Sequence, residues 1–230
     1  MKGYKALLKS MRSNYGDMTY ELNKEYEIEG ELIMCENGYH FCKELINVYY
    51  YYPLDSRVFE IDTLDGEIIK KDDIDKYCTN KIKLVREISR EEINKYIEDN
   101  LDKFIYNKNW RKRLIPAQLR YGLDKLINDE SFMVRAEVAK QGYGLDKLIN
   151  DEDYNVRLAV ARQGYGLDIL INDEDWCVRL AVARQGYGLD KLINDESFMV
   201  RAEVAKQGYG LDKLINDEDS YVRVIASENL

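Results

Sequence analysis

The stretch YGLDKLINDESFMVRAEVAKQG, residues 121–142, decides the fold of the C-terminal half of this chain. Close copies of these 22 residues follow one another without a gap, and they begin at Tyr143, Tyr165, Tyr187 and Tyr209. Residues 121–153 even return letter for letter at 187–219. An internal period of about 20 to 50 residues is typical of solenoids, in which each unit packs mainly against its neighbours. The sequence therefore predicts an array of stacked units in this half.

Each copy has the pattern of two short helices. In residues 123–127, Leu and Ile at positions i, i+3 and i+4 form one apolar helix face. The acids of NDE, residues 128–130, are expected at the start of a second helix, where they interact favourably with the helix dipole. That helix carries the apolar residues of 134–139 inward, and Gly142 is expected to end it. A hairpin this small cannot bury its own apolar face, so stacking must stabilise it.

A degenerate copy precedes the clear ones, because Arg113 and its neighbours align with Arg135 and its neighbours. The array then holds six units within residues 99–230, and the deviant units stand at its ends, as expected of caps. We expect a linking helix and a degenerate N-capping repeat in residues 89–120, followed by five 22-residue repeats in residues 121–230.

These units resemble HEAT-type repeats, or the related leucine-rich-repeat-variant type. The resemblance covers residues 99–230, and an Asp followed six residues later by an Arg that Val precedes is its most specific element. The pairs are Asp129 and Arg135, Asp151 and Arg157, Asp173 and Arg179, Asp195 and Arg201, and Asp217 and Arg223. In HEAT families such residues form a ladder between neighbouring repeats, so the resemblance implies a structural role for them here.

Residues 1–88 have a different pattern, that of a small α+β domain. The segments 19–30, 56–71 and 80–88 are rich in Tyr, Ile and Val with partial alternation, and they are predicted to be strands. The segment CKELINVYYYY, residues 42–52, predicts a short helix, and Ser89 with Glu92 forms a capping box before a clearer one. The predicted fold class is therefore an α+β N-terminal domain followed by an all-α solenoid of short two-helix repeats.

The N-terminal half also resembles a known family. The motif CENGYHFC at 35–42 and the segment CTNKIKLVREI at 78–88 are similar to a small domain often found in phage and mobile-element proteins. The resemblance covers roughly residues 1–92, and no activity is assigned to that family. It implies a phage or mobile-element setting more than a mechanism.

Composition and charge narrow the class of protein. The chain of 230 residues is 45% hydrophobic and 33% charged, which is typical of a soluble globular protein. No apolar run of about 18 residues is present, and the N-terminus lacks the apolar core of a secretory signal, so we expect a cytoplasmic protein with no membrane partner. The four cysteines have no CxxC spacing and are expected to be reduced thiols.

Nucleic acid is the less favoured partner, because the formal net charge is −9 and phosphate recognition favours a cationic surface. The segment 103–120 is a local exception, with six basic residues. They are Lys103, Lys108, Arg111, Lys112, Arg113 and Arg120. A solvated cap is the favoured interpretation of this patch, and a nucleic-acid-binding solenoid that uses Arg111, Lys112 and Arg113 is the alternative.

His40 is the only histidine, so chemistry that depends on histidine is confined to it. Cys35, His40, Cys42 and Cys78 form a possible zinc set, but the C-x4-H-x-C spacing contains no CxxC knuckle, so no metal and no cofactor are predicted. A cysteine nucleophile with His40 as its base lacks a recognisable orienting acid. We expect His40 and Cys42 in or near the core, with the ring nitrogen bonded to backbone. An enzymatic head delivered by the repeats remains an alternative.

The run Tyr49–Tyr52 could stack a base or fill a groove in a partner. Alternate burial of its rings at the end of an element is the favoured interpretation.

Differences among the repeats are concentrated in the second helix. Positions 133, 136, 137 and 140 change, and their i, i+3, i+4 and i+7 spacing places them on one helix face. The unchanged positions are expected to form the stacking surface, and the variable ones an outward stripe. Neutral drift at exposed positions is the alternative explanation.

The stripe predicts a partner-binding surface, and its apolar members favour a protein partner. Its residues are Met133, Glu137, Lys140, Tyr154, Asn155, Leu158, Arg162, Trp176, Cys177, Leu180, Arg184, Met199 and Glu203. We therefore expect a non-enzymatic protein-binding protein of phage or mobile-element origin, whose oligomeric state is left open. One specific hypothesis is an inhibitor of a host defence nuclease, in which the acidic solenoid occupies a nucleic-acid channel.

Overall fold

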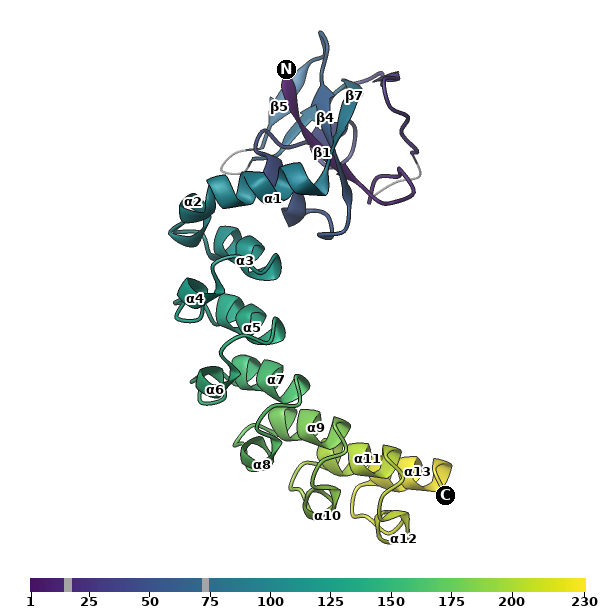
Figure 1. Ribbon diagram of the computed structural model, residues 1–230. Helices are drawn as coiled ribbons and strands as arrows, with labels where there is room; N and C mark the ends of the chain where they lie inside the picture. The colour runs from purple at the N-terminus through teal and green to yellow at the C-terminus, as the bar shows by residue number, and fades with distance from the viewer. Residues whose placement is uncertain (15–17, 72–74) are drawn as a thin grey trace. The chain divides into compact units, whose positions relative to one another are not determined.

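The computed structural model describes residues 1–14, 18–71 and 75–230. It divides the chain into two compact units, Met1–Leu101 and Asp102–Leu230 (Figure 1). The first is built on antiparallel sheets and the second is a series of short helices that pack one after another. The predicted fold class, an α+β region followed by an all-α solenoid, is thereby confirmed. No described helix is long and apolar enough to cross a membrane.

The strands of the first unit pair antiparallel in two sheets. Their bounds are β1 Lys2–Leu7, β2 Glu25–Glu27, β3 Tyr39–Phe41, β4 Arg57–Asp62, β5 Ile68–Lys70, β6 Tyr77–Thr79 and β7 Lys81–Ile88. One sheet has the order β1-β4-β7-β2 and the other the order β3-β6-β5. The predicted strand segments 56–71 and 80–88 contain β4, β5 and β7, whereas 19–30 contains only the three residues of β2.

A core of alternating apolar residues holds these sheets together. Inward-facing residues of β1, β4 and β7 meet side chains from β3 and from the segment before β2. The core consists of Leu7, Tyr20, Tyr39, Phe41, Phe59, Ile61, Ile82 and Leu84. Gly38 precedes β3 with a φ of +138°, and a Cβ there would collide with the Cys78 sulfur, so this close approach requires glycine.

The predicted short helix and the predicted capping box are both present in this unit. Residues Leu45–Tyr50 form a 3₁₀ helix, η1, most of whose residues are buried. Helix α1 spans Arg90–Asp99, where the Ser89 hydroxyl accepts from the Glu92 N–H and the Glu92 carboxylate accepts from the Ser89 N–H. Helix α1 lies within the first compact unit.

The second unit repeats a short helix and a nine-residue helix. The short helices are α2 Leu101–Ile105, α4 Leu123–Leu126, α6 Leu145–Leu148, α8 Leu167–Leu170, α10 Leu189–Leu192 and α12 Leu211–Leu214. The second helices are α3 Trp110–Gln118, α5 Phe132–Lys140, α7 Tyr154–Arg162, α9 Trp176–Arg184, α11 Phe198–Lys206 and α13 Ser220–Glu228. Each second helix packs against the next one along the chain (Figure 1).

Local hydrogen bonds close the N-terminal ends of α3, α7, α9 and α13, whereas the N-cap serines of α5 and α11 make no side-chain cap bond. The N-cap residue is Asp153 in α7, whose carboxylate accepts from the N–H of Asn155. The acids of NDE thus precede the helix instead of occupying its first turn, which corrects the sequence prediction: Asp129 accepts from the Ser131 N–H. At the other end Gly142 ends α5 with a φ of +75° and donates to the Ala139 carbonyl, as predicted.

A buried arginine ladder connects successive repeats. Each rung is a bidentate pair, with Nε to Oδ2 distances of 2.6 to 2.8 Å. The rungs are Arg113 with Asp129, Arg135 with Asp151, Arg157 with Asp173, Arg179 with Asp195, and Arg201 with Asp217. The remaining nitrogen, Nη1, donates to backbone carbonyls of the arginine's own repeat. The guanidinium therefore joins two repeats and leaves little of its donor capacity unused.

Candidate functional site

The exposed apolar side chains of the second helices are concentrated in the first turn. Its first position is aromatic in four successive repeats, and Trp176 at the centre is 40% exposed. The next position carries Met133 and Met199, which are exposed, or Asn155 and Cys177, which are half-buried. We call this set the first-turn row. It consists of Phe132, Met133, Tyr154, Asn155, Trp176, Cys177, Phe198 and Met199.

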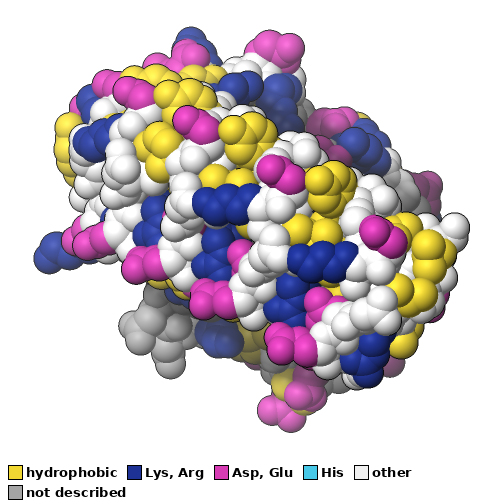
Figure 2. All heavy atoms as spheres, turned by 90° about the horizontal axis from the view of Figure 1, so that it is seen from below, with side chains coloured by type: hydrophobic (Ala, Val, Ile, Leu, Met, Phe, Trp, Pro, Cys, Tyr) yellow, Lys and Arg dark blue, Asp and Glu magenta, His cyan; other side chains and the backbone are white. Residues whose placement is uncertain are grey.

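At its C-terminal end the row contacts the last repeat. The rings of Phe198 and Tyr221, which belong to successive repeats, meet edge to face with centroids 6.3 Å apart. Figure 2 shows that apolar, basic and acidic side chains recur in rows across the face in view, with polar atoms between the apolar groups. The apolar groups on that face are therefore a series of separate contacts and not one large patch.

Two of the four variable positions do not face outward, which corrects the predicted stripe. Glu203 is only 8% exposed, and Glu137, Leu158 and Leu180 are half-buried. These residues lie where one second helix packs on its neighbour: Glu203 accepts from Arg184 Nε of the preceding repeat at 3.3 Å. Because neighbouring second helices pack side by side, positions 136 and 137 and their equivalents in the other repeats fall in the contact between the two helices.

The variation at these positions is consistent with packing. The pair Ala136 and Glu137 of one repeat corresponds to Leu158 and Ala159 of the next, so a large side chain moves by one position while the contact stays filled. Both Ala136 and Ala159 are buried. At the C-terminal end of the same helices Lys140, Arg162 and Arg184 are exposed, as predicted.

Sequence reasoning missed a second exposed row, formed by the turn tyrosines. They are Tyr143, Tyr165, Tyr187 and Tyr209, each 41 to 42% exposed. Each stands between two glycines that both have positive φ. Ile169 was also missed: it is 56% exposed where three other repeats have a lysine that donates to an Asn of the preceding repeat.

The predicted basic patch is reduced in the structure. Arg113 is buried in the first rung of the ladder, and Arg120 donates to the carbonyl of Gln141. The guanidinium of Arg111 lies 4.9 Å from the centroid of the neighbouring Trp110 ring. Arg113 is thus a structural residue, and the nucleic-acid alternative loses one of its three proposed contacts.

In the first unit, His40 is held as a neutral ring. Its Nε2 accepts the Cys35 N–H at 2.9 Å, so the predicted bond to backbone is present. Burial and the nearby Lys76 and Lys5 lower the pKa of His40 to about 4. Burial also raises the pKa of Cys42 to about 12, which disfavours its thiolate. Among the described residues no cluster of three or more His, Cys, Asp and Glu side chains is placed to hold a metal ion.

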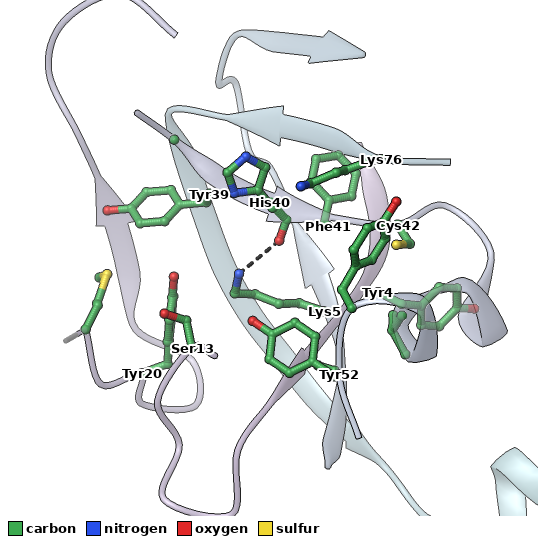
Figure 3. Close-up of a pocket in the computed structure, with 15 residues that line it drawn as sticks. Tyr4, Lys5, Ser13, Tyr20, Tyr39, His40, Phe41, Cys42, Tyr52 and Lys76 are labelled. Carbon is green, nitrogen blue, oxygen red and sulfur yellow. Dashed lines mark hydrogen bonds between the residues drawn. The ribbon is translucent and has the colours of Figure 1, made fainter. Parts of the chain in front are cut away.

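The same unit contains a cavity of about 210 Å³ next to His40 (Figure 3). Residues of β1, β3 and the segment after η1 line it, and Tyr51 and Tyr52 of the tyrosine run are among them. Of that run only Tyr49 is buried, so the predicted alternate burial is wrong. Lys5 of β1, which sequence reasoning did not single out, is 4% exposed and lines the cavity.

Comparison with known proteins finds a family match in the N-terminal unit. Residues 1–99 match a family described as a domain of unknown function, DUF7666. The match contains every strand of the first unit together with η1 and α1, and it stops before the repeats. No curated protein matches the sequence. The N-terminal unit is therefore similar to a family without an assigned function, and the helical repeats lie outside that similarity.

Proposed function

We propose that this chain is a non-enzymatic binding protein whose repeats engage a partner protein through the first-turn row. One observation carries the proposal. In the four repeats that begin at residues 121, 143, 165 and 187, the ladder and the buried positions equivalent to Leu126, Ile127, Val134, Val138 and Ala139 are unchanged, whereas the first-turn row changes among Phe, Tyr and Trp and among Met, Asn and Cys. A fixed scaffold with a variable exposed edge is how solenoids present a binding surface.

The chemistry of the row favours a protein partner. Trp, Tyr, Phe, Met and Arg are the residues enriched in protein interfaces, and Trp, Tyr and Arg dominate their binding energy. Trp176 stands at the middle of the row, and Arg162 and Arg184 are exposed at the far ends of the same helices. We expect a partner that offers apolar side chains to the rings and acidic groups to the arginines.

Two finer parts of the proposal rest on resemblance. The arginine ladder supports the similarity of the repeats to the HEAT type, whose members are binding scaffolds. The similarity of residues 1–92 to domains of phage and mobile-element proteins supports a phage setting, and with it the hypothesis of an inhibitor of a host defence nuclease. A cytoplasmic location belongs to the same proposal.

Affinity capture from the native host with two matched triple variants tests the interface. The first, Tyr154→Glu, Trp176→Glu and Phe198→Glu, places charges in the first-turn row. The control, Tyr143→Glu, Tyr165→Glu and Tyr187→Glu, changes turn tyrosines of the same exposure. We leave Leu158 and Leu180 unchanged, because their half-burial would mix a folding defect with a binding defect.

We expect the wild type and the control variant to capture the same partner protein, and the first variant not to capture it. A change in the tryptophan fluorescence of this chain on addition of the purified partner then confirms direct binding, since Trp176 lies in the row. Capture of the same proteins by both variants would remove the proposal. Capture that nuclease treatment abolishes, with steep salt dependence and loss in Arg111→Glu, would instead favour nucleic acid.

A further inference from the structure

The cavity in the first unit contains a buried ammonium group that has no counter-ion among the described residues. Lys5 Nζ donates to the His40 carbonyl at 2.9 Å and lies 5.2 Å from the centroid of the Tyr20 ring. An ammonium has three donors, and this hydrogen bond uses one of them. Among the residues that the structure describes, no carboxylate pairs with Lys5. Such a charge is unfavourable in a protein interior unless an anion joins it.

A second cation faces the same cavity. Lys76 lines it with its ammonium 5.0 Å from the centroid of the Tyr51 ring, and Nζ donates to the Cys35 sulfur at 3.1 Å. Figure 3 shows the ends of Lys5 and Lys76 directed toward His40. The neighbouring carboxylate of Asp75 is engaged elsewhere, because it accepts from the backbone N–H groups of Lys43 and Glu44.

The rest of the lining is aromatic and uncharged. No Asp or Glu is among the described residues that line the cavity, and its walls are largely rings. These rings belong to Tyr4, Tyr20, Tyr39, Phe41, Tyr51 and Tyr52. The volume of about 210 Å³ is below the usual range for sites that bind drug-sized ligands. The cavity thus accommodates a small ligand with a flat apolar body.

We propose that this cavity binds a small organic anion, a carboxylate attached to a planar ring, with the carboxylate at Lys5 and Lys76 and the ring among the tyrosines. Both halves of the ligand follow from the lining: ammonium groups attract an anion, and tyrosine faces stack on planar apolar groups. The neutral imidazole of His40 does not compete with Lys5 and Lys76 for the anion. The site is separate from the proposed repeat interface, so either can fail without the other.

Proton NMR of the full chain tests the site with sodium benzoate as the probe. His40 is the only histidine, so its Cε1–H signal reports on the cavity without labelling. Benzoate is expected to shift this signal saturably, with the millimolar affinity usual for a ligand of this size. Benzamide has the same shape without the charge and should bind about tenfold more weakly or worse, and acetate, which lacks the ring, should also bind more weakly.

Three variants complete the experiment. Lys5→Met and Lys76→Met should each weaken benzoate binding about tenfold, whereas Lys95→Met, which removes an exposed charge on α1, should leave it unchanged. If Lys5→Met does not fold, Lys76→Met decides the result, since Lys76 is only half-buried. Equal affinity for benzoate and benzamide, no saturable shift, or an equal loss in Lys95→Met would overturn the proposal.

Discussion

The two units differ in whether a buried cation is paired with a carboxylate. In the repeats, Arg157 forms a bidentate pair with Asp173 and donates its remaining nitrogen to carbonyls of its own repeat. In the N-terminal unit, Lys5 is more deeply buried and has one carbonyl and one ring as its described partners. A fully paired buried charge is a structural element, whereas an unpaired one is destabilising and available to a ligand. Stability and binding are thus assigned to different cations.

The same contrast holds for variability. Each rung of the ladder joins residues 16 positions apart, so a repeat depends on its immediate neighbours and its exposed row can change without disturbing the array. The cavity instead needs residues of β1, β3 and the segment before β6 together, and a change in any of them alters the lining. The repeats therefore suit a surface that varies, and the sheet unit suits a pocket of defined chemistry.

Breaking one rung should have the largest effect. Asp173→Ala leaves Arg157 buried without its carboxylate, and the loss of one partner of a buried ion pair typically lowers stability by about 3–5 kcal/mol. Urea unfolding followed by tryptophan emission measures this in the repeats alone, because both tryptophans, Trp110 and Trp176, lie there. The control Glu174→Ala removes an exposed carboxylate of the same rung and should change stability by less than about 1 kcal/mol. Equal effects would contradict the assigned role of the ladder.

Removing the ammonium group of Lys5 should raise stability, whereas breaking a rung lowers it. Burial lowers the pKa of Lys5 to about 8 from its ordinary 10.5, so between these values the unfolded chain binds a proton that the folded unit does not. Its contribution to stability therefore rises with pH from about 8 to 10.5, and below pH 8 the full penalty, on the order of 3 kcal/mol, remains. Lys5→Met should stabilise the first unit at pH 7 by up to that amount.

The His40 Cε1–H signals of folded and unfolded protein report the equilibrium of that unit in urea. The comparison must be the difference between wild type and Lys5→Met across pH, because Cys42, with a pKa raised by burial to about 12, lowers stability as pH rises above its ordinary 9. A difference that stays constant from pH 7 to 10.5 would show that Lys5 keeps its proton and is not the destabilising group.

Substitutions at two glycines of the repeats can distinguish the effect of backbone conformation from the effect of a steric contact. Gly166 has a φ of +60°, and a Cβ there would collide with Cδ1 of Ile149 in the preceding repeat. Gly186 has a φ of +72° and no atom within 4 Å of such a Cβ. Gly186→Ala should lower stability by about 1 kcal/mol through backbone strain alone, and Gly166→Ala by about 2–3 kcal/mol because overpacking is added. Tryptophan emission in urea measures both, and equal losses would exclude a contribution from the contact.

The smallest effect is expected at Ile169, where an exposed apolar side chain replaces the usual lysine. Ile169→Lys should restore a bond to Asn150 like the one between Lys191 and Asn172, and should raise stability by no more than about 0.5 kcal/mol. The reverse change, Lys191→Ile, should lower it by a similar amount. A loss above about 1 kcal/mol in Ile169→Lys would mean that Ile169 packs in the folded array.

Sequence reasoning succeeded where the physics is local. The capping box of Ser89 and Glu92 and the glycine end of α5 depend on residues a few positions apart, and both were predicted. It failed where a neighbour from elsewhere matters. Glu203 was assigned to an outward stripe because a helical pattern shows which residues share a face but not which neighbour that face meets. Strand β3 escaped notice because it has three residues and pairs with β6, far along the chain.

By itself, the sequence determined the repeat period, the two helices of each unit, the exposure of Trp176 and the strand character of 56–71 and 80–88. These follow from apolar periodicity, turn glycines and charge, which act within one unit. Only the tertiary structure decided that Arg113 is a ladder residue, that Glu203 lies between helices and that Lys5 lines a cavity. In each case the deciding partner comes from another helix or strand, and the balance between burial and pairing exists only once the chain has packed.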